Sequence, residues 1–487
     1  MNYSIILYII GSVLKIEGVL LTLPALVGLL YGEKHAWAFL FCAALTFLCG
    51  LLLSRRKPKN QNFYAKEGFV SVALSWLALS LFGCLPFMLN RDIPHFADAF
   101  FETVSGFTTT GSTILKDVEV LSHASLFWRS FTHWIGGMGV LVFLLTILPI
   151  AGGATMHLMR AESPGPQVGK IVPKVKDTSK ILYIIYTVMT VAEILILLCC
   201  RMPLFDAVTL SLGTAGTGGF AILNSGIAGY SAAAQYVIAV FMLLFGVNFN
   251  VYFLLVRRRL RQAARCEEAR WYWGIIAVSV TVVFLNTLKL FPTAEEAFRH
   301  ALFQVGSIIT TTGYSTTDFN LFPALSHAVL ILLMFIGACA GSTGGGIKVS
   351  RIIVLAKSWF HEVSRIIHPR TVKKIRLEGK VVDHGTIRSI NTYMAAYVAI
   401  FAASLLLIAL DNNDFTTNFS AVTATLNNIG PGLNTVGPMG NFSDFSILSK
   451  LVFCFDMLAG RLELFPLLIL FVPHIWKPER RQRAKES

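Results

Sequence analysis

Charged residues are scarce in this chain, and their scarcity excludes an ordinary soluble domain. Asp, Glu, Lys and Arg make up 14% of the 487 residues, whereas 55% are hydrophobic. Soluble domains carry about 25% charged residues. We therefore expect most of the chain to lie in a lipid bilayer.

Signatures of enzymes, redox centres and cleaved leaders are also missing. The eight cysteines form no CxxC pair, so buried, unpaired thiols are expected. The chain has no HExxH or GxSxG motif, which disfavours an integral-membrane enzyme, and no covalently bound cofactor is expected. The first residues, MNYSIILYII, lack a basic segment. We interpret them as a retained first helix rather than a signal peptide.

Ten apolar stretches are each long enough to cross a bilayer, which takes about 20 residues. They lie at roughly 5–30, 35–53, 68–90, 125–150, 181–200, 234–256, 272–291, 325–358 (interrupted), 389–410 and 447–473. Four shorter stretches lie near 95–107, 203–213, 295–309 and 415–427. These four fit re-entrant helices better than crossing ones, because each has only about 10–15 residues.

The Lys and Arg residues indicate how these spans are oriented. Five regions hold 31 of the 41 basic residues, namely 54–67, 151–180, 257–270, 348–388 and the tail from 477. With ten spans, all five fall on one face, which the positive-inside rule assigns to the cytoplasm. Both termini are therefore expected to be cytoplasmic. The opposite face is rich in Asp and Glu, which either concentrate cations at a pore mouth or form an ordinary solvated surface.

One unit recurs four times from residue 68 onward: an apolar span, a short helix, a loop rich in Gly and Thr, and a second apolar span. The loops are TTTGST at 108–113, AGTGGF at 215–220, TTTGYS at 310–315 and NNIGPG at 427–432. Aligning them pairs Gly111 with Gly218, Gly313 and Gly430, at intervals of 107, 95 and 117 residues. The predicted domains are a two-helix N-terminal domain with its cytoplasmic loop (1–67) and four repeats (68–180, 181–270, 271–388 and 389–487).

The composition of the loops points to a binding site for a monovalent cation. Backbone at membrane depth must be hydrogen-bonded or line an aqueous path, and glycine lets successive carbonyls turn toward one axis. Four such loops would form a ring of oxygens able to replace the hydration shell of a cation. The loops hold no acidic or basic side chain, which disfavours a divalent cation. The alternative is four turns that merely pack helices. The candidate filter residues are Thr109, Thr110, Gly111, Thr217, Gly218, Gly219, Thr311, Thr312, Gly313, Asn428, Ile429 and Gly430.

Several motifs resemble those of the Trk/Ktr/HKT superfamily of potassium transporters, and most closely those of its bacterial TrkH branch. They are GFTTTG at 106–111, WIGGMG at 134–139, RAESPGP at 160–166, GSTGGGIK at 341–348, ATLNNIGPG at 424–432 and GRLE at 460–463. The resemblance covers nearly the whole chain. It implies an all-α polytopic protein of the bacterial inner membrane. Four helix–pore-helix–filter-loop–helix repeats would surround one pseudo-fourfold pore, with two extra N-terminal transmembrane helices.

The same resemblance implies potassium as the substrate, a homodimer, and a cytosolic nucleotide-binding (TrkA-like) regulatory subunit as partner. The basic stretch from Arg365 to Lys380 is a candidate docking surface, although a solvated loop fits equally well. One departure is GTAGTGG at 213–219, where related proteins tend to have bulkier residues. We expect a looser second loop and weaker discrimination against sodium.

The eighth span is interrupted by GACAGSTGGGIK at 337–348, which has five glycines. A regular helix is disfavoured there, at about 1 kcal/mol per glycine relative to alanine. The resemblance makes this break an intramembrane gate below the filter, and a passive packing kink is the alternative. A nucleotide-binding P-loop is disfavoured because Ile347 separates Gly346 from Lys348. The candidate gate residues are Gly341, Ser342, Thr343, Gly344, Gly345, Gly346 and Lys348.

Arg461 lies inside the last apolar span, where a charge is costly and suggests a function. The resemblance implies an electrostatic barrier in the pore below the filter. The alternative is a structural arginine paired with Glu463 or with backbone carbonyls. Glu463 is a poor partner, because residues i and i+2 do not share a helix face. His133 and Trp134 are interpreted as packing residues rather than ligands. The main functional rival is a proton- or sodium-coupled potassium symporter, which would normally place ionisable residues at the substrate site.

Overall fold

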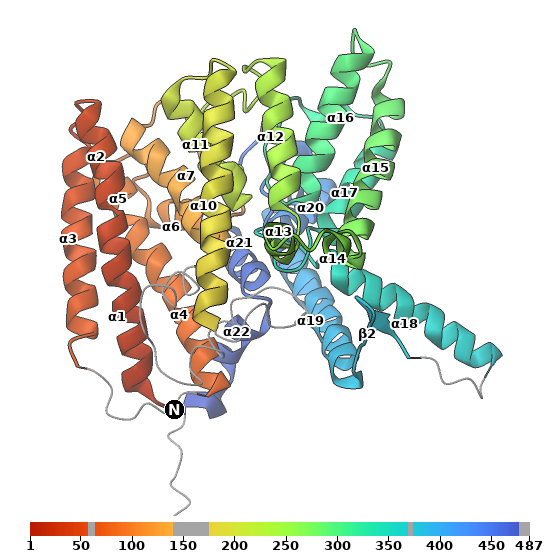
Figure 1. Ribbon diagram of the computed structural model, residues 1–487. Coiled ribbons are helices and arrows are strands. Elements are labelled where there is room, and N and C mark those ends of the chain that lie inside the picture. Colours follow the sequence, from red (N-terminus) through yellow and green to blue (C-terminus); the bar gives the residue numbers. More distant parts are fainter. Residues whose placement is uncertain (57–63, 140–174, 369–373, 477–487) are drawn as a thin grey trace, which may run out of the picture.

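A computed structural model describes residues 1–56, 64–139, 175–368 and 374–476, and these are helical almost throughout (Figure 1). In these ranges the only strands are β1 (Arg376–Leu377) and β2 (Lys380–Val381), which pair antiparallel. The predicted all-α class is therefore confirmed. Several predicted features lie outside the described residues: half of the basic loop 54–67, most of the basic loop 151–180, the end of the fourth span, the motif at 160–166 and the basic tail.

The first two predicted spans pack tightly together at one side of the molecule (Figure 1). They comprise α1 (Tyr3–Leu20), α2 (Thr22–Leu30) and α3 (Ala36–Leu53). A Cβ on Gly11 of α1 would lie 2.7 Å from the carbonyl oxygen of Gly50 on α3. Small residues permit such close backbone contact between membrane helices, which associate through van der Waals packing.

Each of the four repeats places a helix of 12 to 16 residues between two other helices. Repeat 1 holds α4 (Ala65–Gly83), α5 (Leu85–Leu89), α6 (Phe96–Phe107) and α7 (His123–Gly137). Repeat 2 holds α10 (Val175–Cys199), α11 (Leu204–Gly216), α12 (Ala232–Phe245), α13 (Phe249–Val256) and α14 (Leu260–Ala264). Repeat 3 holds α15 (Glu267–Thr287), α16 (Ala294–Ile309), η1 (Phe319–Leu321), α17 (Ala324–Ile336) and α18 (Val349–Ile367). Repeat 4 holds α19 (His384–Ile408), η2 (Ala409–Asp411), α20 (Phe415–Leu426), η3 (Asn434–Val436), α21 (Ile447–Arg461), α22 (Phe465–Leu468), η4 (Ile469–Phe471) and η5 (Pro473–Trp476).

The short helices α6, α11, α16 and α20 coincide with the four segments predicted to be too short to cross the membrane. Among the described residues, six helical segments are long and apolar enough to cross, and a seventh is bent. The six are Tyr3–Leu30, Ala36–Leu53, Ala65–Leu89, Lys180–Cys199, Glu267–Thr287 and His384–Asp411. They confirm six of the ten predicted spans, and the chain is a multi-pass membrane protein.

Two predicted spans are wrong as continuous helices. The span at 234–256 is bent by 92° between α12 and α13. There the side chain of Asn248 caps α13, and the Phe249 N–H donates to the carbonyl of Gly341 at 3.0 Å. The span at 447–473 ends as α21 at Arg461, because Glu463 and Leu464 have left-handed φ angles of 60° and 65°. The interruption predicted at 337–348 is present, between α17 and α18.

Candidate functional site

The four candidate filter loops share one backbone conformation. Each short helix is followed by a residue with a left-handed φ and, two positions later, by a glycine with a left-handed φ. The φ angles are 56° and 81° for Thr109 and Gly111, 55° and 75° for Thr217 and Gly219, 58° and 87° for Thr311 and Gly313, and 56° and 102° for Asn428 and Gly430. The equivalent of Gly111 in repeat 2 is therefore Gly219, and the predicted alignment with Gly218 was one residue off. Both positions are glycine in that repeat, so composition alone did not distinguish them.

The middle residue of each loop lies between these two positions, and its backbone N–H makes the same hydrogen bond in all four repeats. Each N–H turns back and donates to the carbonyl five residues earlier, near the end of its short helix. The bonds are Thr110 to Ser105 at 2.9 Å, Gly218 to Gly213 at 2.9 Å, Thr312 to Ser307 at 2.8 Å and Ile429 to Ala424 at 2.8 Å. The loop donors thereby satisfy carbonyls that a helix end leaves without an intrahelical partner.

Neighbouring loops touch in a cyclic order. In every repeat, the filter glycine lies against the carbonyl oxygen of the middle loop residue of the next repeat. An added Cβ would lie 2.0 Å from the Gly218 oxygen at Gly111, 2.0 Å from the Thr312 oxygen at Gly219, 2.1 Å from the Ile429 oxygen at Gly313 and 2.7 Å from the Thr110 oxygen at Gly430. The fourth contact returns to the first repeat, so the loops form a closed ring of four. Only glycine fits both the backbone angle and the space at these positions.

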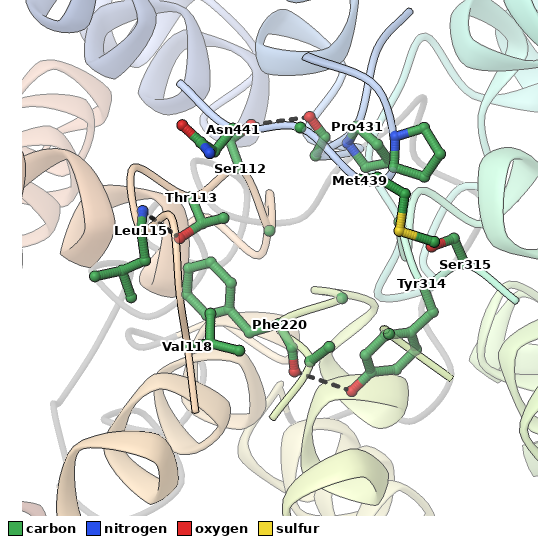
Figure 2. A pocket seen from close by; sticks show the side chains of 18 of the residues that line it. Ser112, Thr113, Leu115, Val118, Phe220, Tyr314, Ser315, Pro431, Met439 and Asn441 are labelled. Atoms are coloured by element: carbon green, nitrogen blue, oxygen red, sulfur yellow. Dashed lines mark hydrogen bonds between the residues drawn. The ribbon is translucent and has the colours of Figure 1, made fainter. Parts of the chain in front are cut away.

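The four ring glycines line one cavity of about 160 Å³. Figure 2 shows segments of all four repeats around it. Its wall also includes Ser112, Tyr314 and Pro431, which follow the ring in repeats 1, 3 and 4. The predicted filter residues are thus brought together at a single centre.

The interrupted segment 337–348 lies against the loops of repeats 3 and 4. The Gly345 N–H donates to Thr311 Oγ1 at 2.6 Å, and the Gly346 N–H donates to the Asn427 carbonyl at 3.1 Å. The Lys348 ammonium donates to the Gly344 carbonyl within the segment. The predicted gate residues therefore contact two of the four filter loops directly.

Arg461 joins the end of α21 to two other parts of the chain. Its guanidinium donates to the carbonyl of Thr343 in the interrupted segment at 2.8 Å. It also donates to the carbonyls of Gly136 and Gly137 at the end of α7, at 2.5 and 2.7 Å. Backbone carbonyls were one of the partners considered for it, whereas Glu463 pairs with Arg351.

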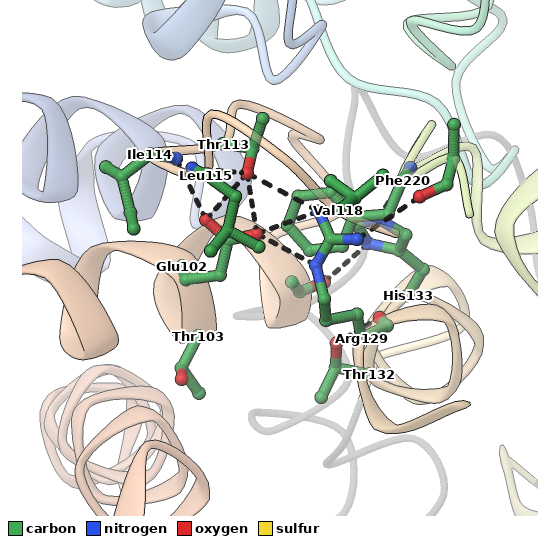
Figure 3. A network of polar contacts seen from close by, with 12 residues as sticks. Glu102, Thr103, Thr113, Ile114, Leu115, Val118, Arg129, Thr132, His133 and Phe220 are labelled. Carbon is green, nitrogen blue, oxygen red and sulfur yellow. Dashed lines mark hydrogen bonds and ion pairs between the residues drawn. The ribbon is translucent and has the colours of Figure 1, made fainter. Parts of the chain in front are cut away.

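Sequence reasoning missed a buried ion pair beside the first loop (Figure 3). Arg129 of α7 donates from Nε to Glu102 of α6 at 2.9 Å. Glu102 also accepts from the Thr113 hydroxyl at 2.9 Å and the Ile114 N–H at 3.0 Å, while Arg129 reaches the Ala221 carbonyl of the second loop at 3.2 Å. The sequence does hold a signal for this pair, because Glu102 lies in a short apolar helix and Arg129 lies in an apolar span. The network links the outer ends of loops 1 and 2.

The second loop is packed, and the expectation of a looser loop there is wrong. A Cβ on Gly213 would lie 2.1 Å from the hydroxyl oxygen of Tyr314, and one on Gly218 would lie 2.1 Å from the ring of His133. Larger side chains from repeats 1 and 3 therefore occupy the space beside these glycines.

Together, the buried ring and the surrounding apolar helices define a class of protein, a multi-pass membrane protein with four repeats around one pore. Residues 34–478 match the model of the TrkH family, described as a cation transport protein, and the chain belongs to that family.

The relatives and solved structures agree with this class. The chain is 38% identical to the Trk system potassium uptake protein TrkH of Escherichia coli K12, over 98% of this chain and 100% of that protein. It is 31% identical to TrkG of the same organism, over 93% and 94% of the two chains. The crystal structure of the potassium transporter TrkH from Vibrio parahaemolyticus matches with a TM-score of 0.87 at 34% identity, covering 98% of this chain and 100% of that one. The predicted four-repeat architecture with two extra N-terminal helices is confirmed.

Proposed function

We propose that this chain carries potassium into a bacterial cell across the inner membrane, through a channel-like pore, and that it is not an enzyme. The observation that supports this most directly is the closed ring of four loops, in which each ring glycine lies against a carbonyl oxygen of the next loop. Rings of carbonyl oxygens replace the hydration shell of a monovalent cation. Relatives that match over the full chain are potassium uptake proteins, which favours potassium as the transported substrate.

The selectivity filter of this proposal consists of the three central residues of each loop. In every loop the N–H groups of the first two of these residues are bonded back to the short helix, so the carbonyl oxygens are the groups that we expect to face a cation. The short helices end at the ring, and the partial negative charge of a helix C-terminus favours a cation there. In repeats 1 and 3, the hydroxyls of Thr108 and Thr110, and of Thr310 and Thr312, lie 2.8 Å apart and add oxygens next to the loops.

The proposed gate is the segment 341–348 together with Arg461. The gate contacts the filter loops through Gly345 and Gly346. Arg461 holds the Thr343 carbonyl and adds a fixed positive charge beside the segment. A shift of this segment away from Thr311 and Asn427 would open the path below the ring, with Arg461 acting as an electrostatic barrier to cations.

The wider organisation follows the predicted map: an N-terminal domain at 1–67, four repeats from 68 onward, and both termini in the cytoplasm. We include a homodimer and a TrkA-like nucleotide-binding regulator in the proposal. Support comes from α18, which projects from the bundle (Figure 1). It exposes Trp359, Phe360 and Ile366 at 72%, 72% and 80%. Exposed apolar patches of this kind mark interaction sites.

Rubidium uptake into proteoliposomes tests the proposal, with sodium as competitor, for the natural chain and for Gly313→Ser. The natural chain is expected to take up rubidium along the membrane potential and to reject sodium. The substitution should lower this preference by about tenfold or more, since left-handed strain alone costs roughly 1–3 kcal/mol. Gly32→Ser is the matched control, because Gly32 also has a left-handed φ of 69° but no atom within 4 Å of an added Cβ.

The same assay separates a pore from a coupled symporter. Uptake that requires a proton or sodium gradient would favour the symporter. Selectivity unchanged by Gly313→Ser would place the ion site elsewhere. Absence of uptake by the chain alone calls for the same measurement with the cytosolic partner added.

A further inference from the structure

His133 is a fully buried histidine that connects the first two repeats (Figure 3). It lies on α7 of repeat 1. Its Nδ1 lies 2.8 Å from the carbonyl of Gly106 in the pore helix α6. Its Nε2 accepts a hydrogen bond from the Phe220 N–H of the second filter loop at 3.2 Å. The two partners define the proton positions: Nδ1 must carry the hydrogen, because a carbonyl only accepts, and Nε2 must be bare, because an N–H only donates.

The second loop is shaped around this histidine. A Cβ on Gly218 would lie 2.1 Å from Cγ of His133, and a Cβ on Gly216 would lie 2.2 Å from its carbonyl oxygen. The ring of His133 also packs on that of Phe220, with centroids 4.3 Å apart. The imidazole therefore occupies the volume into which a side chain at position 218 would point.

Repeats 1 and 3 have threonine side chains at the equivalent positions. By the shared φ pattern, Gly216 and Gly218 correspond to Thr108 and Thr110 in repeat 1 and to Thr310 and Thr312 in repeat 3. In those repeats the two hydroxyls are hydrogen-bonded to each other at 2.8 Å. Repeat 2 has no side chain at either position, so it cannot make this contact for itself.

We propose that His133 is a positioning residue for ion selectivity: its imidazole replaces the missing threonine pair and holds the second filter loop in register with the other three. This inference rests on the proposed function, because it assumes that the ring selects the ion. The glycines of the second loop do not make it loose, since the rigidity comes from a neighbouring repeat. Selectivity should then depend on a residue that need not touch the ion.

Four variants test the role of the imidazole in rubidium uptake with sodium as competitor. His133→Ala and His133→Leu lose both hydrogen bonds and should lower the potassium-to-sodium preference by about tenfold, as expected for two buried bonds. His133→Gln should keep most of the preference, because its amide both donates and accepts. His327→Ala is the matched control, since His327 contacts the Phe319 carbonyl rather than a filter loop.

A compensating pair provides an independent test. Gly218 is not among the glycines with a left-handed φ, and the three atoms nearest to an added Cβ all belong to the imidazole of His133. Gly218→Thr alone should impair selectivity. The double variant with His133→Ala and Gly218→Thr puts one threonine of the pair found in repeats 1 and 3 into the space that the imidazole leaves, and it should discriminate better than either single variant.

The outcomes are distinguishable. A natural chain that takes up sodium as readily as potassium would overturn the proposed function, and this inference with it. If the natural chain is selective, a wild-type preference in His133→Ala, or a double variant no better than the worse single one, overturns the inference alone. Should His133→Ala fail to fold, His133→Gln and the double variant decide: a selective double variant supports the inference, and an unselective His133→Gln opposes it.

Discussion

At the scale of single residues, the geometry of the ring predicts that alanine substitutions at its four glycines differ in how strongly they reduce selective uptake. The space for a Cβ is smallest at Gly111, Gly219 and Gly313, where the facing oxygen lies at 2.0 to 2.1 Å, and largest at Gly430, at 2.7 Å. Alanine at the first three positions should therefore abolish selective rubidium uptake, while Gly430→Ala should retain a measurable part of it. Sodium competition in proteoliposomes measures both. Equal loss at all four positions would mean that backbone strain, rather than contact with the next loop, sets the effect.

The sequence located the loops that hold the twelve proposed filter residues, but it did not show how neighbouring repeats support these loops. Spacing and composition located the loops, because glycine and threonine recur in register. The choice between Gly218 and Gly219 depended on φ angles that adjacent glycines do not reveal. The interpretation of His133 as a packing residue described its environment and missed its two hydrogen bonds. Those partners, like the pairing of Glu102 with Arg129, are distant in sequence and come together only through the fold.

At the scale of elements, the sequence predicted the lengths of the short helices but only one of the three breaks in the apolar spans. The four short helices and the break at 337–348 were expected, since apolar length and clustered glycines are local properties. The bend between α12 and α13 falls on Gly246, Val247 and Asn248, and the Gly246 carbonyl accepts from the Cys339 N–H at 3.1 Å. Just after the end of α21, Glu463 forms an ion pair with Arg351 on α18. Tertiary contacts cause both interruptions, so hydropathy alone gives a continuous span.

From the contacts of the interrupted segment we predict a substitution that opens the ion path below the ring. A Cβ on Gly345 would lie 2.4 Å from the Asn427 carbonyl oxygen, so Gly345→Ala should push the segment away from the filter and break its bond to Thr311. Rubidium uptake by the chain alone should rise by about fivefold, the effect of losing one net hydrogen bond of about 1 kcal/mol. Gly274→Ala on α15 is the control, because Gly274 has no left-handed φ and no atom lies within 4 Å of its added Cβ. A folded Gly345→Ala protein with unchanged or lower uptake would argue for a passive kink.

At the scale of the whole molecule, the ring is held by contacts that each cross from one repeat to the next. Filter glycines meet the carbonyls of the following loop, Asn428 donates to the Thr110 hydroxyl at 3.0 Å, and Arg461 spans from repeat 4 to repeats 1 and 3. One chain therefore completes its own pore. A second copy is not needed to build the ring, so a dimer would serve stability or regulation.

The exposed face of α18 is where we expect the second copy of the proposed dimer to bind. Trp359 and Phe360 are each 72% exposed, on a helix that projects beyond the bundle (Figure 1). Replacing both with serine should convert the purified dimer to a monomer, measured by light scattering in detergent, while rubidium uptake persists because the ring lies within one chain. Serine at Trp37 and Phe41 of α3, which are 69% and 60% exposed, is the matched control and should leave the dimer intact. A dimer that survives the α18 substitutions but no longer responds to the cytosolic regulator would assign this face to the regulator instead.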